Sequence, residues 1–229
     1  MISYATLDAW AKFPDFNARF TNLVAEKIAH TRLLVGFHGQ SAATTTDPST
    51  NKKGEDVNVG WLKHLENDNP AGYLKEATTG SGEITIGKTG NFKTVEELAY
   101  TLKSMIDSKY SHSDLVCFSS SDLVVQNNAT LYQKVGTPTE VSAMETYMQS
   151  GQTMAGMPLV EIPQMPAKTM LVTSYANLEM YIQTTGLRRS VKRDDEYNCI
   201  KNFYSSNECY QLGNPEKATA IHGANVKFV

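Results

Sequence analysis

One segment of the sequence fits a phosphate-binding pattern. Gly82–Thr89 reads GEITIGKT and satisfies G-x-x-x-x-G-K-[ST], in which backbone N–H groups and a lysine hold nucleotide phosphates. Such a loop must follow a buried strand and open directly into a helix, so that the N–H groups converge on phosphate. Here the preceding residues are not hydrophobic, Glu83–Ile86 itself alternates like a strand, and the next helix begins only near Thr94. We favour a strand and turn, and keep a nucleotide-binding enzyme that uses Gly82–Thr89 as the alternative.

The other reactive side chains form no catalytic or metal-binding pattern. The three cysteines are odd in number and lack metal-ligand spacing, which indicates reduced thiols. Cys117 lies in an apolar run, so we expect a buried, inert thiol. No two of the five histidines have the i, i+4 spacing of helical metal ligands; they are His30, His38, His64, His112 and His222. We predict no catalytic residue, no cofactor and no metal site.

The densest basic cluster consists of Arg188, Arg189, Lys192 and Arg193, directly followed by Asp194–Glu196. We place this cluster in a short loop between β-like segments. The simpler interpretation is a solvated hairpin whose opposite charges compensate one another. The alternative is a contact with a neighbouring subunit that carries acidic counterparts.

The composition describes a globular chain. It has 229 residues, 41% hydrophobic and 20% charged, with a formal net charge of −3. This argues against disorder and against strong nonspecific binding of nucleic acid by the whole surface. No apolar run approaches the roughly 20 residues that cross a bilayer, and the start lacks a signal-peptide pattern.

Helical periodicity dominates the first two thirds of the chain. A long amphipathic helix follows Pro14, which suits a first helical turn, and ends at Gly36 and Gly39, which act as stop signals. Further helices are predicted from Thr94, as an N-cap, to Ile106, from Ser120 or Ser121 to Leu131, and over residues 138–148. Residues 40–82 are turn-rich and polar.

Strand patterns dominate the last third. A buried strand is expected earlier in the chain, over Asp114–Phe118. The β-like segments of the last third are residues 159–162, 169–173, 178–182, 197–203 and 225–229. Helices first and strands later predict an α+β fold.

In this order, the segments resemble the major capsid proteins of tailed bacteriophages, of the P-two-like (peduovirus) type. The matching segments are residues 4–11, 36–39, 56–62, 90–92 and 170–173, Asn177, Tyr181, residues 188–189 and 202–207, and Tyr210. The resemblance covers nearly the whole chain, and it depends on the order and spacing of segments that are weak individually.

The resemblance implies the tailed-phage capsid fold, of the Hong Kong ninety-seven type. Its parts are expected as the spine helix of a peripheral domain over residues 1–39, a mainly axial domain over 40–177, a peripheral β segment over 178–212 and a return to the axial domain over 213–229. Family members carry an N-terminal arm and an extended loop before the spine helix. Because neither is found here, we expect an N-terminally truncated chain.

The function implied is that of a non-enzymatic virion protein, made in the bacterial host cytoplasm. It would self-assemble into hexamers and pentamers of an icosahedral shell that encloses phage DNA without sequence-specific contact. Expected partners are other copies of the chain, with scaffolding protein and portal during assembly, and no membrane. A host-encoded interaction module derived from a prophage capsid is the remaining alternative.

Overall fold

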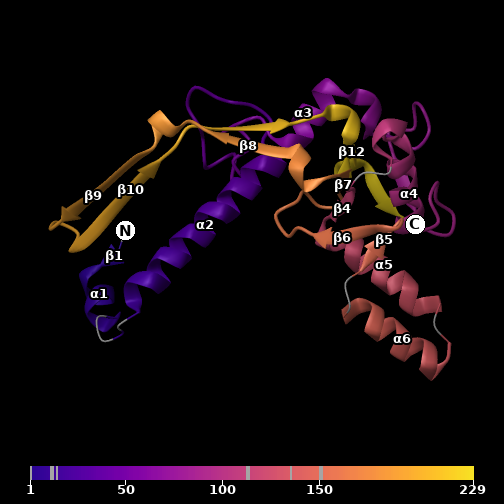
Figure 1. Cartoon of the computed structure of the whole chain (residues 1–229), viewed down its shortest axis with the longest axis horizontal. Helices are drawn as coiled ribbons and strands as arrows, with labels where there is room; N and C mark the ends of the chain where they lie inside the picture. Colours follow the sequence, from indigo (N-terminus) through magenta and orange to yellow (C-terminus); the bar gives the residue numbers. More distant parts are fainter. Residues whose placement is uncertain (1, 11–12, 14, 112–113, 135, 150–151) are drawn as a thin grey trace. The chain divides into compact units, whose positions relative to one another are not determined.

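The computed structural model describes residues 2–10, 13, 15–111, 114–134, 136–149 and 152–229, which form two compact units (Figure 1). The smaller unit comprises Met1–Arg32 and Met180–Cys209, and the larger unit comprises Leu33–Glu179 and Tyr210–Val229. The expected start of the long helix at Pro14 lies outside the described residues. Three elements belong partly to each unit: α2 (Phe16–His38), β8 (Leu178–Ile182) and β11 (Glu208–Leu212), of which β8 and β11 pair with each other.

The smaller unit combines helix and antiparallel sheet. Its remaining elements are β1 (Ile2–Ser3), α1 (Tyr4–Trp10), β9 (Arg188–Asp194) and β10 (Cys199–Ser205). The sheet order is β1-β10-β9, so β9 lies at an edge. The basic cluster was predicted in a short loop, and this placement is wrong, since all four cations belong to β9. The backbone pairing with β10 forms the strand, although its side chains show no apolar alternation.

The described part of α2 in the smaller unit keeps one stripe half-buried. Phe16, Phe20, Val24, Ile28 and Arg32 recur at i+4 spacing, which places them on one helix face. At the end of this stripe, Arg32 donates through Nε and Nη2 to the Glu208 carboxylate at 2.9 and 2.5 Å. This bidentate ion pair joins α2 to the strand segment of the same unit.

The larger unit is built on a mixed six-stranded sheet, with the order β2-β12-β7-β4-β6-β5. Figure 1 shows the central strands side by side. The strands are β2 (Tyr73–Leu74), β4 (Val116–Ser119), β5 (Thr153–Met154), β6 (Met157–Glu161), β7 (Met170–Thr173) and β12 (Thr219–Ile221). A separate parallel pair consists of β3 (Ile84–Ile86) and β13 (Val226–Phe228).

Among the described residues, four α-helices lie wholly in the larger unit: α3 (Trp61–Asp68), α4 (Val95–Met105), α5 (Ser121–Lys134) and α6 (Pro138–Gln149). The prediction of the Thr94 cap is confirmed, because its side chain accepts from the Glu97 N–H at 3.1 Å. α4 packs on β7 and β12, and its buried Leu98 and Leu102 belong to the main hydrophobic core.

Residues 40–82 were predicted to be turn-rich and polar, and no helix was predicted among them, but they contain α3. Trp61, Leu62 and Leu65 are buried on one face of this short helix, which explains why an apolar patch interrupts a polar segment. The Trp61 ring packs against Phe37 and Tyr210, with ring centroids 5.1 and 5.2 Å apart.

The long helix was predicted to end at Gly36 and Gly39. This is confirmed for Gly39, because α2 ends at His38, and wrong for Gly36, because the helix continues through it. A Cβ at Gly36 would lie 2.8 Å from Cε3 of Trp61, closer than side-chain atoms pack. The glycine therefore allows the helix backbone to approach the indole ring. Local sequence cannot distinguish this role from a C-terminal stop.

We expect Gly36→Ala to destabilise the protein by about 1–3 kcal/mol through overpacking against Trp61. Alanine favours a helix by about 1 kcal/mol over glycine, so a net loss isolates the clash. Urea unfolding measures the change. Gly136→Ala is the control, because a Cβ there meets nothing nearer than 4.0 Å. Equal stability of the two variants would contradict close packing at Gly36.

The three thiols should react very differently in the folded protein. Cys117 and Cys199 are buried and Cys209 is exposed, and burial raises the pKa of Cys117 to about 12. Since the thiolate is the reactive form, a thiol reagent at neutral pH should label Cys209 alone and all three cysteines after denaturation. Mass spectrometry of the labelled peptides checks this, and rapid native labelling of Cys117 would disprove the burial of β4.

Candidate assembly surface

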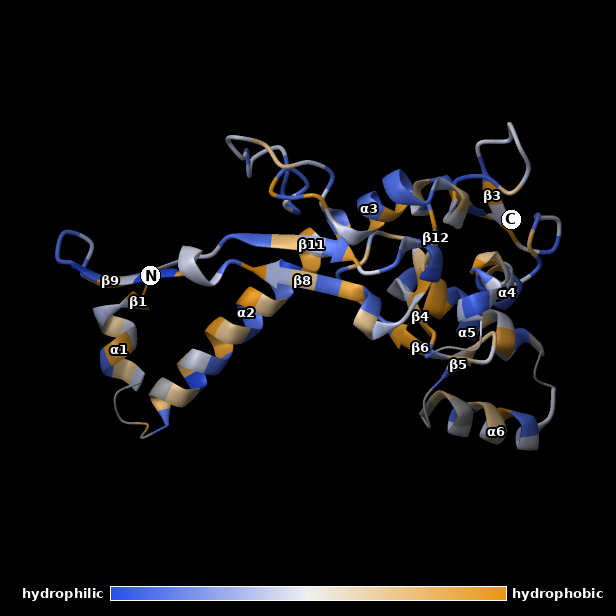
Figure 2. Cartoon of the chain, turned by 45° about the horizontal axis from the view of Figure 1, so that its top comes forward, coloured by the Kyte–Doolittle hydropathy of each residue, from blue (hydrophilic) through white to orange (hydrophobic). Residues whose placement is uncertain are grey.

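The structure places Arg188, Arg189, Lys192 and Arg193 along a single exposed edge strand. Figure 2 shows β9 as a mostly hydrophilic strand, in contrast to the apolar β4. None of the four cations makes an ion pair or hydrogen bond with the described residues. The four cations therefore take no direct part in the predicted self-compensation among the described residues, and their side chains are exposed; the ion pair within the hairpin joins Asp194 to Lys201 of β10 instead.

The acidic residue that ends β9 and the two in the turn after it have other partners or none. Asp194 forms an ion pair with Lys201 of β10, and the Lys201 hydrogen bond lowers the pKa of Asp194. Asp195 accepts from the Tyr4 hydroxyl at 3.2 Å. Glu196 is exposed, without a hydrogen bond or ion pair from its side chain to the described residues. The hairpin therefore presents a basic strand and an acidic turn as separate charges.

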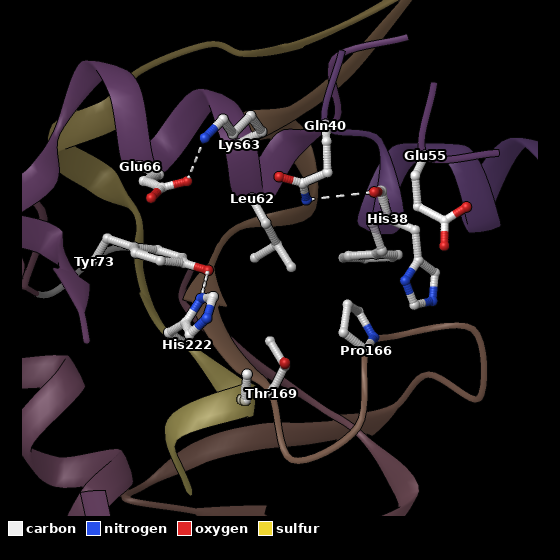
Figure 3. A pocket seen from close by; sticks show the side chains of 13 residues that line it. His38, Gln40, Glu55, Leu62, Lys63, Glu66, Tyr73, Pro166, Thr169 and His222 are labelled. Atoms are coloured by element: carbon white, nitrogen blue, oxygen red, sulfur yellow. Dashed lines mark hydrogen bonds and ion pairs between the residues drawn. The ribbon is translucent and has the colours of Figure 1, made fainter. Parts of the chain in front are cut away.

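A pocket of about 200 Å³ lies in the larger unit (Figure 3). Its polar side chains mostly engage one another: Lys63 pairs with Glu66 at 2.8 Å, and the Tyr73 hydroxyl lies 3.1 Å from Nδ1 of His222. Burial raises the pKa of Tyr73 to about 12, and burial lowers the pKa of His38. This chemistry supplies no activated nucleophile with a base beside it.

The phosphate-binding pattern adopts a different structure from the one that it requires. Within Gly82–Thr89, β3 occupies the middle of the pattern, and α4 begins only at Val95. A Cβ at Gly87 (φ +147°) would collide with the backbone oxygen of Val229, so this glycine admits a close approach of the chain. The nucleotide-binding alternative is not supported, because no N–H cradle opens into a helix here.

His38 and His222 line the pocket described above, whereas His30 and His64 do not. His38 is buried at the end of α2, His64 lies 3.7 Å from Asp68, and His222 contacts Tyr73, while His112 lies outside the described residues. Across the residues that the structure describes, no group of three or more His, Cys, Asp or Glu side chains could hold a metal ion. In the same residues, no helix combines the length and apolarity needed to cross a membrane.

Glu66 should make the larger unit sensitive to acid. Hydrogen bonds first from Lys63 and then from Lys75 lower the pKa of Glu66 from 4.5 to about 2. Its folded-state pKa is depressed, so its contribution is fully present above pH 4.5 and is lost as pH falls towards 2.

We expect Glu66→Gln to lower the free energy of unfolding by about 1–2 kcal/mol at neutral pH, after allowance for solvent screening. Near pH 2 the loss should be almost nothing, because Glu66 is then largely protonated in the parent protein. Thermal unfolding midpoints of both proteins across the acid range measure the difference. The exposed Glu145→Gln is the control, and a constant difference between the Glu66 variant and the parent at every pH would contradict the titration.

Comparison with known proteins identifies the family. The family model "Phage major capsid protein, P2 family" matches residues 1–224. The "Capsid proteins" of Escherichia phage P2 are 29% identical over 97% of this chain and 69% of their own length. The "Major capsid protein" of Serratia phage KSP20 is also 29% identical, over 97% of this chain and 66% of its own length. The chain thus spans about two thirds of these relatives.

Solved structures show the same fold. The "Satellite phage P4 procapsid including size determination (Sid) protein" matches with a TM-score of 0.86 and 26% identity, over 100% of this chain and 69% of that one. The "Capsid of empty GTA particle" matches with a TM-score of 0.55 and 13% identity, over 96% of this chain and 69% of that one. This match supports the fold alone. The predicted α+β tailed-phage capsid fold is confirmed. The chain belongs to the P2 family of phage major capsid proteins.

Proposed function

We propose that this chain builds an icosahedral shell by packing into hexamers and pentamers, with its larger unit as the axial domain and its smaller unit as the peripheral domain. As a member of its family, it is a structural protein of the virion capsid and not an enzyme. The observation that carries the proposal is the TM-score of 0.86 to a procapsid subunit over the entire chain.

The division of the chain supports these domain assignments. The smaller unit holds most of the long helix and the β9–β10 ribbon, which is the composition expected of a spine helix with a peripheral sheet. The larger unit holds the mixed sheet and the main hydrophobic core, as expected of an axial domain.

Shell building requires repeated contacts between identical copies. In a closed symmetric assembly, the same contact occurs between every pair of equivalent neighbours. We infer that Arg188, Arg189, Lys192 and Arg193 belong to such a contact. They are exposed on a strand that is unpaired on one side among the described residues, and truncation there removes no packing from the core.

The further partners follow from the same proposal. Other copies of the chain come first, and scaffolding protein and portal act during assembly. The net charge of −3 suits a wall that encloses DNA without gripping it, so DNA contact is not sequence-specific.

The purified chain should self-associate as its concentration rises, and Arg188→Ala with Arg189→Ala should weaken this association without lowering the thermal unfolding midpoint. The reason is that exposed side chains contribute little to folding, whereas contacts between copies depend on them. Sedimentation velocity and negative-stain microscopy across a concentration series measure the assembly.

Lys88→Ala with Lys93→Ala is the matched control, since it removes two exposed positive charges from the larger unit. A parent chain that stays monomeric throughout would contradict the proposed assembly of this chain into hexamers and pentamers. Normal association of the arginine variant would contradict only the assigned contact.

A further inference from the structure

His38 carries a buried imidazole at the carboxyl end of α2. It is the last residue of this helix, belongs to the larger unit and is only 9% exposed. The ring forms a hydrogen bond with the backbone of Gln164. No carboxylate among the described residues forms an ion pair with it, in contrast to His64, which has Asp68 at 3.7 Å. Such surroundings favour the neutral imidazole, because burial penalises the charged form.

The charged groups near the ring do not offset its burial. Burial is the largest influence on the pKa of His38 and lowers it, and the Lys53 ammonium lowers it further. The Glu55 carboxylate acts in the opposite direction but is weaker. On α2 itself, the last charged residue before His38 is Arg32, which is paired with Glu208.

The pocket beside His38 contains other titratable groups. Figure 3 shows Tyr73 and His222 across the pocket from His38. Glu66, paired with Lys63, has a pKa of about 2, and the pKa of Tyr73 is raised to about 12, so neither changes its charge between pH 7 and pH 5. His222 is therefore the group whose titration must be distinguished from that of His38.

The segment after His38 folds back beside the ring. Its start and end both belong to the pocket wall, through Gln40 and Glu55. Three backbone N–H groups near its start donate to carbonyl oxygens near its end: Gln40 and Ser41 to Glu55 at 2.8 and 3.1 Å, and Ala43 to Asp56 at 2.9 Å.

This segment yields more easily than the other segment beside the ring. Residues 41–50 are all exposed, whereas residues 162–169 include the buried Met165 and Thr169. In the latter segment, Lys168 also donates to the backbone oxygen of Val226 at 3.1 Å. Because segments with few buried side chains open at a lower free energy, opening of residues 40–56 is the least costly way to admit water to a charged ring.

We propose that neutral His38 holds residues 40–56 closed beside the pocket, and that protonation of its ring in mildly acidic solution opens this segment. The inference concerns the larger unit alone. It goes beyond the proposed function, since it holds whether or not copies of the chain associate.

Linkage gives the pH range of the opening. The folded-state pKa of His38 lies below its ordinary value of 6.5, so the stability contributed by the neutral ring is fully present above pH 6.5. That contribution is lost as pH falls from 6.5 towards the folded-state pKa. Acid therefore favours the opened segment, whose solvated ring binds the proton more tightly.

Amide hydrogen exchange of the whole chain measures the opening. With rates corrected for the intrinsic chemistry at each pH, the N–H groups of Gln40, Ser41 and Ala43 should exchange about threefold to tenfold faster at about pH 5 than at about pH 7. The amides of Leu98 and Leu102 in α4 should keep their protection, because both side chains lie in the main hydrophobic core.

Histidine variants identify the group that titrates. His38→Gln removes the titrating ring and should make the protection of residues 40–43 independent of pH. His64→Gln and His222→Gln are the matched controls, and both should keep the parental pH dependence.

Two exposed lysines test the same point without altering the buried ring. Lys53→Gln removes the cation that lowers the pKa of His38, so the opening at about pH 5 should be smaller than in the parent. Lys52→Gln changes the neighbouring exposed residue and should leave the opening unchanged. This pair of variants keeps the test decisive if His38→Gln does not fold.

Equal protection of residues 40–43 at both pH values in the parent would overturn the inference. So would a pH dependence that persists in His38→Gln or disappears in His222→Gln, or an equal effect of Lys52→Gln and Lys53→Gln. Equal loss of protection in α4 and in residues 40–43 would also overturn it, because acid would then unfold the whole unit.

Discussion

Trp61 packs, within the larger unit, against residues from each of the three segments through which the chain leaves or enters that unit. Its ring fills the space beside Gly36 and packs edge-to-face against the ring of Phe37 on α2. Its indole N–H donates to the backbone oxygen of Glu179 at 2.9 Å, and its other side meets the ring of Tyr210. One buried side chain thereby contacts all three segments within the larger unit, close to its boundaries at residues 32/33, 179/180 and 209/210.

The sequence predicts the elements whose causes are local. Thr94 predicts the start of α4, because its hydroxyl caps the helix that directly follows it. The apolar run that includes Cys117 predicts β4, since a short continuous apolar run with β-branched and aromatic residues is typical of a buried strand. The basic cluster can be recognised from the sequence by its density of positive charge, and this charge is the only sequence feature that suggests a contact there.

Elements whose causes lie far away in the sequence are not predictable in this way. β9 is a strand because β10 pairs with it, whereas its own residues read as a solvated loop. Gly36 and Gly87 have ordinary local signatures, a helix stop and a phosphate loop. Their actual roles depend on Trp61 and Val229, which the fold brings against them. A pattern therefore identifies a site only when its surroundings provide the geometry that the chemistry needs.

The position of β12 in its sheet determines the order in which the larger unit can be completed. β12 (Thr219–Ile221) lies between β2 (Tyr73–Leu74) and β7 (Met170–Thr173), so these two strands, although synthesised much earlier, have no shared neighbour until residue 221 has been made. During synthesis, β2 therefore waits for most of the chain, and such long-range pairing is slow and leaves strand edges open meanwhile. A nascent chain that stops short of β12 lacks the strand that joins β2 to the rest of the sheet, and it lacks the core residue Ile221. Completion of the six-stranded sheet during translation thus depends on the synthesis of β12.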